Sequence, residues 1–171
     1  MQGFLTPNDV LGELKLSQGM KGADFGCGAG GWTIPLAKIL EEGRVYAVEI
    51  QEEPLSALKA KANLERIHNI ETMIADVEKG TSIPSGILDV VLMTNVLYQC
   101  YDKEGVIAEA KRVLKPGGKI LIVDWIKDNP LTNELEKVDF DNIKFFAKSE
   151  GLKLEKEFQA GDYHLALILV K

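Results

Sequence analysis

The sequence predicts an α/β fold, with a mostly parallel sheet that carries helices on both faces. Short apolar runs typical of strands alternate along the chain with segments whose apolar residues have helical spacing. The run at 88–94, Leu-Asp-Val-Val-Leu-Met-Thr, is almost wholly apolar, as is typical of a central parallel strand covered on both faces. A glycine-rich turn at 26–31 joins the first of these strands to the helix that follows.

The glycine-rich turn lies in the stretch around which the chain is organised. Residues 20–25 form a strand-like run, and an amphipathic helix follows over 34–40. The turn between them contains Gly26, Gly28, Gly30 and Gly31. Without Cβ atoms the backbone can turn tightly, and a ligand can approach the main chain. Strand, glycine turn and helix in this order indicate the entry to a nucleotide-binding βαβ unit.

The spacing Gly26-x-Gly28-x-x-Gly31 leaves two classes of cofactor open. It fits the fingerprint for a nicotinamide or flavin dinucleotide, and it also fits a site for S-adenosylmethionine. Asp24 separates the two. An acid two residues before the first glycine would repel the pyrophosphate of a dinucleotide at the helix start. S-adenosylmethionine has no phosphate and carries an ammonium and a sulfonium, so Asp24 favours it.

A second acid follows at the expected distance. Glu49 lies at the carboxyl end of the buried strand-like run 44–50, 23 residues after Gly26. A carboxylate about 20 residues after the glycine turn can accept hydrogen bonds from ribose hydroxyls. The alternative is a solvated charge at a strand end, and the spacing favours the ribose. Both cofactor classes contain a ribose, so Glu49 does not discriminate between them.

The remaining elements complete a single domain over residues 1–171. The N-terminal segment 1–19 contains a short helix at 8–14, which either folds over the cofactor cleft as a lid or covers the sheet edge. The patterns predict these further elements in order: helix 53–66, strand 70–75, a turn-rich connection at 81–87, helix 103–114, strand 119–124, a mixed segment at 125–138, a helix ending at 150 that Asp139 or Asp141 caps, and strands 152–158 and 163–170.

Four features, in this order, resemble class I S-adenosylmethionine-dependent methyltransferases. They are Ala-Asp-Phe-Gly-Cys-Gly-Ala-Gly at 23–30, Glu49, Ile-Ala-Asp-Val at 74–77, and Leu-Lys-Pro-Gly-Gly-Lys-Ile-Leu at 114–121. The resemblance covers nearly the whole chain, and it is greatest to small single-domain enzymes of the ubiquinone/menaquinone-biosynthesis type. It implies a Rossmann-like, seven-stranded, mostly parallel sheet that ends in a C-terminal antiparallel hairpin.

The resemblance also implies a set of site residues. Asp76 would accept a hydrogen bond from the adenine amino group, although Asp at this place is also a common turn cap. The expected cofactor-binding residues are Asp24, Gly26, Cys27, Gly28, Gly30, Glu49, Ile50, Asp76, Val77 and Asn95.

Catalytic candidates lie at or just after the carboxyl ends of the strands 88–94 and 119–124, because open α/β sheets bind ligands there. They are Asn95, Tyr98 and Asp124. Asn95-x-x-Tyr98 has the spacing of the Asn-Pro-Pro-Tyr motif of amino-methylating enzymes but lacks both prolines. Asp124 could act as a base or cap the following loop, and His164 is expected to be structural.

Composition and net charge restrict the kinds of binding partner that we expect. The net charge of −6 disfavours a broad nucleic-acid surface, and no apolar run approaches the length of a membrane span. Cys27 and Cys100 lack metal-type spacing, so we expect no metal and reduced thiols in the cytoplasm. We expect a small-molecule acceptor or an exposed side chain to enter between the N-terminal segment, the loop 95–102 and the segment 125–138.

Two other classes of protein stay open. The first is a non-catalytic methyltransferase-fold subunit that binds a partner, and the second, less favoured, is a dinucleotide-dependent oxidoreductase. An oligomer or a partner subunit is compatible with the sequence in every case.

Overall fold

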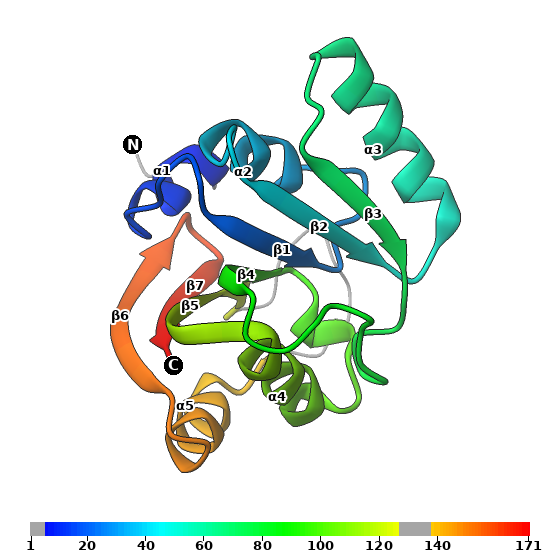
Figure 1. Cartoon of the computed structure of the whole chain (residues 1–171). Helices are drawn as coiled ribbons and strands as arrows, with labels where there is room; N and C mark the ends of the chain where they lie inside the picture. Colours follow the sequence, from blue (N-terminus) through cyan, green and yellow to red (C-terminus); the bar gives the residue numbers. More distant parts are fainter. Residues whose placement is uncertain (1–5, 127–137) are drawn as a thin grey trace.

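The computed structural model describes residues 6–126 and 138–171. Within these residues the chain forms a seven-stranded sheet in the order β3-β2-β1-β4-β5-β7-β6 (Figure 1). The strands are β1 (Lys21–Phe25), β2 (Arg44–Glu49), β3 (Ile70–Ile74), β4 (Leu88–Thr94), β5 (Leu114–Trp125), β6 (Lys153–Ala160) and β7 (His164–Val170). Strands β1 to β5 run parallel, and β7 is antiparallel to both of its neighbours, β5 and β6. The predicted sheet and its C-terminal hairpin are confirmed.

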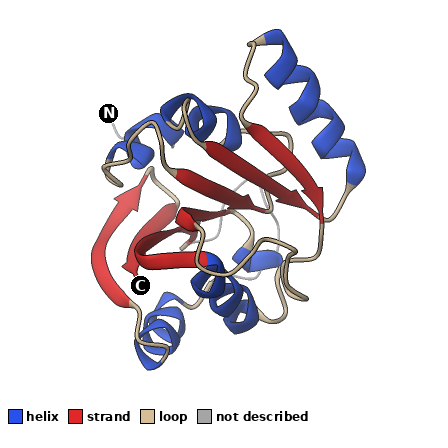
Figure 2. Cartoon of the chain, viewed as in Figure 1, coloured by secondary structure: helices blue, strands red, loops and turns tan. Residues whose placement is uncertain are grey.

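Helices cover both faces of this sheet (Figures 1 and 2). They are α1 (Pro7–Gly12), α2 (Thr33–Ile39), α3 (Glu52–Leu64), the 3-10 turn η1 (Leu97–Gln99), α4 (Lys103–Val113) and α5 (Phe140–Ser149). Apolar side chains of α1 and α2 pack on one face of the sheet, and those of α4 and α5 pack on the other. Covered in this way, Val90 to Met93 of β4 are completely buried, as their apolar run predicts.

The described part of the N-terminal segment covers the sheet. Val10, Leu11 and Leu14 are buried against Leu36 and Leu40 of the α2 segment. Burial of these side chains removes apolar area from water, and that fixes α1 on this face. Residues 7–14 therefore cover one face of the sheet, and residues 1–5 lie outside the described part. The two predicted roles of the whole segment 1–19, a lid over the cofactor cleft or a cover for the sheet edge, stay predictions.

Strand β5 begins earlier than the sequence predicts. The expectation was a turn at 115–118 followed by a strand from 119, but Leu114 already pairs with Leu88 of β4. The register then shifts between Leu88 and Val90, and Gly117 takes a left-handed φ of 79°. The Lys-Pro-Gly-Gly run is thus an irregular start of the strand, because an extended chain can absorb the extra residues as a bulge. Most of the segment 125–138 lies outside the described residues.

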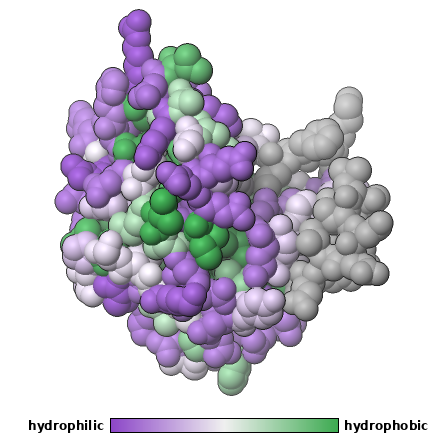
Figure 3. Space-filling model, turned by 90° about the vertical axis from the view of Figure 1, so that its right-hand side faces the viewer, coloured by the Kyte–Doolittle hydropathy of each residue, from purple (hydrophilic) through white to green (hydrophobic). Residues whose placement is uncertain are grey.

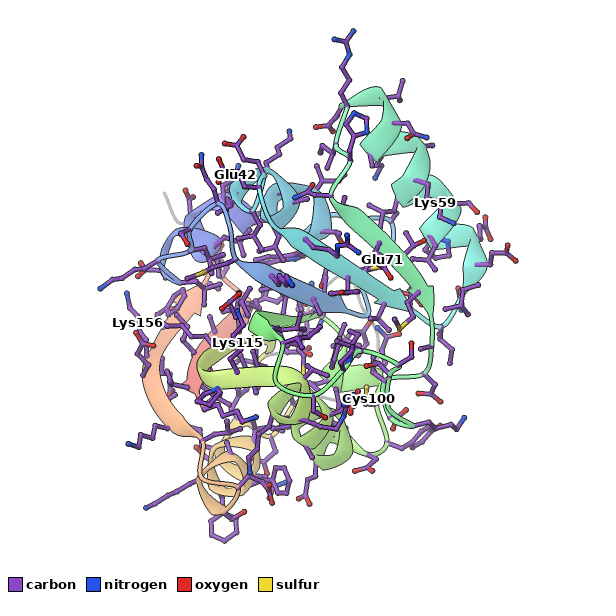
Figure 4. The ribbon with its side chains drawn as sticks, viewed as in Figure 1. Glu42, Lys59, Glu71, Cys100, Lys115 and Lys156 are labelled. Carbon is purple, nitrogen blue, oxygen red and sulfur yellow. The ribbon has the colours of Figure 1, made fainter. Side chains whose placement is uncertain are left out.

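The two ends of the sheet differ in character. At the amino end, Asp89 accepts a hydrogen bond from the Lys21 N–H (2.8 Å) and pairs with Lys115 Nζ (2.7 Å), which is labelled in Figure 4. These contacts tie β1, β4 and β5 together. At the carboxyl end the loops carry the sequence-predicted site residues.

The face drawn in Figure 3 is mostly hydrophilic, with apolar surface confined to small patches. No helix within the described residues combines the length and the apolar character needed to cross a bilayer.

Candidate active site

The glycine turn after β1 has a backbone conformation that is strained for any residue with a side chain. Gly26, Gly28 and Gly30 all have left-handed φ angles, of 72°, 50° and 91°. The N–H groups of Gly26 and Cys27 both donate to Val48 O of β2, at 2.9 and 3.0 Å, so the turn is pinned to the neighbouring strand. A Cβ on Gly26 would lie 2.5 Å from Val96, whereas a Cβ on Gly28 would meet nothing within 4 Å. Open space therefore adjoins the main chain at Gly28.

Asp24 lies beneath this turn and is completely buried. Its Oδ2 accepts a hydrogen bond from the Thr33 hydroxyl (2.6 Å), at the start of α2. Its Oδ1 is sealed from solvent and has no partner among the described residues. Burial raises the pKa of Asp24 to about 7; the Thr33 bond opposes this rise and the charge of Glu49 adds to it. The orphaned oxygen is a place where a nearby cation would be favourable.

Glu49 joins the glycine turn to the end of β2. Its Oε2 accepts from the Gly28 N–H (3.0 Å), and its Oε1 accepts from the N–H groups of Ile50 (2.9 Å) and Gln51 (3.2 Å). A carboxylate has about four acceptor positions, so it can hold these bonds and still accept from a ligand hydroxyl. The sequence predicted Glu49 at this place, and the three backbone bonds show how its side chain is oriented.

Asp76 and Glu49 line one open cavity of about 230 Å³. The Oδ1 of Asp76 accepts from the Glu78 N–H (3.0 Å), and its Oδ2 pairs with Lys79 (2.8 Å). The Lys79 contact, followed by the Glu78 bond, holds the pKa of Asp76 below its usual value. Five of the ten residues predicted to bind the cofactor line this cavity: Gly26, Glu49, Ile50, Asp76 and Val77.

Sequence reasoning missed part of the cavity wall. Val96, Gln99 and Cys100 of the loop after β4 line it as well, and Cys100 is labelled in Figure 4. The Cys100 thiol donates to Val96 O (3.3 Å), and burial raises its pKa to about 11. Burial, with the charges of Asp24 and Glu49, also raises the pKa of Cys27. Both side chains are therefore neutral thiols near pH 7 and serve as apolar surface.

None of the three catalytic candidates lines this cavity, and they lie at or just after the carboxyl ends of β4 and β5. Asp124 is completely buried, and its carboxylate accepts from the N–H groups of Leu97 (2.9 Å), Tyr98 (3.3 Å) and Trp125 (2.9 Å). Burial raises the pKa of Asp124 to about 6 against these three bonds. Asp124 thus holds η1, a turn earlier in the sequence, and also accepts from the residue that follows it. Its predicted role as a base stays a prediction.

Tyr98 and Asn95 face different surroundings. Tyr98 is half-buried, and burial and the charge of Asp124 raise the pKa of its hydroxyl. Asn95 does not line the cavity, and its side chain instead contacts His164 of β7, with Oδ1 2.9 Å from Nε2. No contact with the cavity therefore supports the predicted role of Asn95 in cofactor binding. Its position at the end of β4 agrees with a role near an acceptor.

The residues present fit S-adenosylmethionine as the cofactor. Open space beside Gly28 leaves room for a ligand, the acids Glu49 and Asp76 line one cavity, and the orphaned oxygen of Asp24 suits a cation. No basic side chain is among the residues that line this cavity, and Lys79, which contacts Asp76 from outside this set, is paired with that carboxylate.

A family model described as a methyltransferase domain matches residues 23–122, more than half of the chain. The chain belongs to this methyltransferase family. A "SAM dependent methyltransferase" from Aquifex aeolicus superposes with a TM-score of 0.87 at 26% identity, covering 98% of this chain and 90% of that protein. A putative type 11 methyltransferase from Sulfolobus solfataricus gives a TM-score of 0.74, also at 26% identity, covering 98% and 92%. The predicted fold and the predicted methyltransferase family are confirmed.

Two curated relatives of the same name resemble this chain. A demethylmenaquinone methyltransferase of Lactococcus lactis is 30% identical over 148 residues, 82% of this chain and 56% of that protein. One from Geobacillus stearothermophilus is 31% identical over 111 residues, 64% of this chain and 47% of that protein. The chain thus spans about half the length of these curated relatives. Neither the oxidoreductase nor the non-catalytic subunit is favoured by these likenesses.

Proposed function

We propose that this protein transfers a methyl group from S-adenosylmethionine to a small aromatic acceptor that carries hydroxyl groups, such as a reduced quinone. The observation that carries the cofactor half is Glu49, whose carboxylate ties the glycine turn to the wall of the cavity that Asp76 also lines. The names of the relatives that match most of this chain support the acceptor half. The cytoplasm is the proposed location, since the free thiols Cys27 and Cys100 suit a reducing compartment.

We infer a role for each group at the cofactor cavity. Glu49 has acceptor capacity left for ribose hydroxyls, and Asp76 has it for the adenine amino group. Asp24 is sealed beneath the turn, so it acts on the charged end of the cofactor through its field and not through a direct contact. When bound, S-adenosylmethionine supplies a methyl group on a sulfonium sulfur, which leaves as a neutral thioether.

At the acceptor end the chain's own task is to position the acceptor and exclude water. Asp124 holds η1 through the Leu97 and Tyr98 amides, which places Tyr98 at this end of the sheet. The raised pKa of Tyr98 keeps its hydroxyl protonated, so it is a wall and a hydrogen-bond donor, not a base. The proton of an acceptor hydroxyl is then lost to solvent or to Asp124, and the second route needs η1 to move.

Calorimetry of the purified protein tests the cofactor half. We expect S-adenosylmethionine and S-adenosylhomocysteine to bind and NAD not to bind. Glu49→Ala should weaken S-adenosylhomocysteine binding by on the order of 1.5–3 kcal/mol, the range for hydrogen bonds to a charged group. Because Glu49 also accepts three backbone bonds, the variant must be measured well below its unfolding temperature. Binding of NAD in place of S-adenosylhomocysteine would contradict the proposal.

Transfer of labelled methyl from S-adenosylmethionine to 1,4-dihydroxynaphthalene tests the acceptor half. We expect a methylated product with the reduced compound and none with 1,4-naphthoquinone, because only the reduced ring is electron-rich enough to attack a methyl group. Absence of transfer in a protein that binds S-adenosylhomocysteine would reject this acceptor class and leave the cofactor assignment intact.

A further inference from the structure

Asn95 has an unusual backbone at the exit of β4. Its φ is 53°, in the left-handed region that residues with a side chain seldom adopt. The N–H of Asn95 donates to Val123 O (2.8 Å), and its carbonyl accepts from Gln99 Nε2 (3.0 Å). Strained backbone that the surroundings hold from both sides often marks a functional position. Here it turns the Asn95 side chain across the end of the sheet.

That side chain reaches past a whole strand. Asn95 follows β4 and His164 begins β7, and β5 lies between these two strands. Strands two places apart are separated by about 10 Å, so the two side chains can meet only by leaning over the end of β5. Trp125, the last residue of β5, pairs with His164, and the two rings are in tilted contact with their centroids 4.0 Å apart. Asn95, His164 and Trp125 thus form one cluster on the carboxyl edge of the sheet.

In this cluster the Asn95 amide faces His164 with its oxygen, and this contact determines which nitrogen of the His164 ring carries the proton. The Oδ1 of an asparagine can only accept, so the Nε2 of His164 must carry the proton. His164 is buried, and burial lowers its pKa, so the ring is neutral near pH 7. With Oδ1 engaged, the Nδ2 of Asn95 keeps both N–H groups without a partner among the described residues, and Asn95 is not fully buried. Two free donors therefore face away from His164.

We propose that His164 is a positioning residue of the acceptor site: through its Nε2–H it holds the Asn95 amide so that the two Nδ2–H groups bind an oxygen of the methyl acceptor. This inference rests on the proposed function and adds to it the group that recognises the acceptor. Preorganised donors are most useful where negative charge develops, and a phenolate-like oxygen of the acceptor is such a place. An acceptor with an oxygen next to the methylated atom fits this arrangement.

Three variants separate this role from simple packing. His164→Phe keeps a flat ring against Trp125 and removes the N–H donor. His164→Gln returns an amide N–H close to the position of Nε2. His68→Phe is the matched control, because His68 is exposed at the amino end of β3, away from the cluster. Each protein is first checked for cooperative thermal unfolding and for S-adenosylhomocysteine affinity, which should stay within a few fold of wild type.

Turnover of 1,4-dihydroxynaphthalene gives the kinetic result. We expect His164→Phe to lower kcat/KM by about tenfold, the equivalent of one hydrogen bond. His164→Gln should recover most of this loss, and His68→Phe should match wild type. In an Asn95→Ala background, His164→Phe should cost nothing more, because residues that act through one contact are not additive. Equal losses in both backgrounds, or no loss at all, overturn the proposal.

Nitrogen NMR of the imidazole tests the inference without any acceptor. In the protein with S-adenosylhomocysteine bound, His164 should show the neutral tautomer protonated at Nε2, and Asn95→Ala should shift that signal. The Asn95 side-chain N–H resonances should move in His164→Phe. A ring protonated at Nδ1, or unchanged Asn95 resonances, rejects the inference even if wild-type protein does not methylate the probe. Failure of the probe with wild-type protein, by contrast, rejects only the proposed acceptor class.

Discussion

Single buried carboxyl groups set the pH dependence of this protein. Asp24 has a pKa of about 7 in the folded chain and about 3.8 in a model peptide, because burial disfavours its charged form. The folded state therefore binds a proton more tightly than the unfolded state. The contribution of Asp24 to stability is fully present below about pH 4, and it is lost as the pH rises to about 7.

The predicted result is a difference between wild type and Asp24→Asn. The free energy of unfolding of wild type, relative to the variant, should fall by a few kcal/mol between pH 4 and pH 7 and stay level above that. Urea titrations at several pH values measure it. The comparison is needed because Asp124, with a pKa of about 6, titrates in an overlapping range in both proteins. A constant difference across this range would show that Asp24 is ionised throughout.

At the scale of elements, the glycine turn combines tight packing with open space. Gly26→Ala places a methyl group against Val96 at a left-handed φ, so it should destabilise the fold clearly more than Gly28→Ala. Gly28→Ala meets no protein atom and should cost only about 1–2 kcal/mol of backbone strain. Its methyl group would instead fill the space beside the main chain. We therefore expect S-adenosylhomocysteine affinity to drop at least tenfold in Gly28→Ala, measured by calorimetry.

Wild-type affinity in Gly28→Ala would mean that no ligand approaches the backbone there. If the cofactor assignment is correct, NAD does not bind to the wild-type protein, so Gly28→Ala has no NAD affinity to lower. Gly12→Ala is a suitable control, since a Cβ at Gly12 also meets nothing within 4 Å but the residue ends α1, away from the cavity.

Local patterns were enough to predict most elements and part of the site. The glycine turn, Glu49 and Asp76 follow one another along β1, β2 and β3, so their spacing in the sequence reflects their spacing in the sheet. The cap of α5 was equally local: Asp139 accepts from the Asp141 and Asn142 N–H groups, as one of the two predicted caps. Features that depend on a few neighbouring residues could be read from the sequence.

Features that depend on long-range register could not be predicted. The early start of β5 follows from the pairing of Leu114 with Leu88, which no local pattern contains. The contact of His164 with Asn95 needs the order β4-β5-β7 and the register that sets His164 opposite Trp125. Read alone, a histidine that opens the last strand looked structural. A hairpin register derived from the sequence would have been the only signal for it.

At the scale of the whole molecule, the order of the strands places the candidate site residues together at the carboxyl end of the sheet. Strand β1 lies between β2 and β4, so the loops after all three strands meet at the carboxyl edge. The opposite edge is closed by Asp89 and carries surface grooves lined by His68 and Ile67. Binding should therefore affect the two edges differently.

Hydrogen–deuterium exchange with and without S-adenosylhomocysteine measures this difference. Ligand at 100 times its Kd stabilises the folded state by about 2.7 kcal/mol, so globally exchanging amides slow down throughout the sheet. Amides that exchange by local opening should slow only around residues 26–30, 49–51, 75–78 and 95–100, which form or adjoin the cavity. Peptides covering 62–69, at the amino edge, should keep their rates, and NAD should change none. Protection confined to 62–69 would move the ligand to the opposite edge and overturn the site derived from the glycine turn.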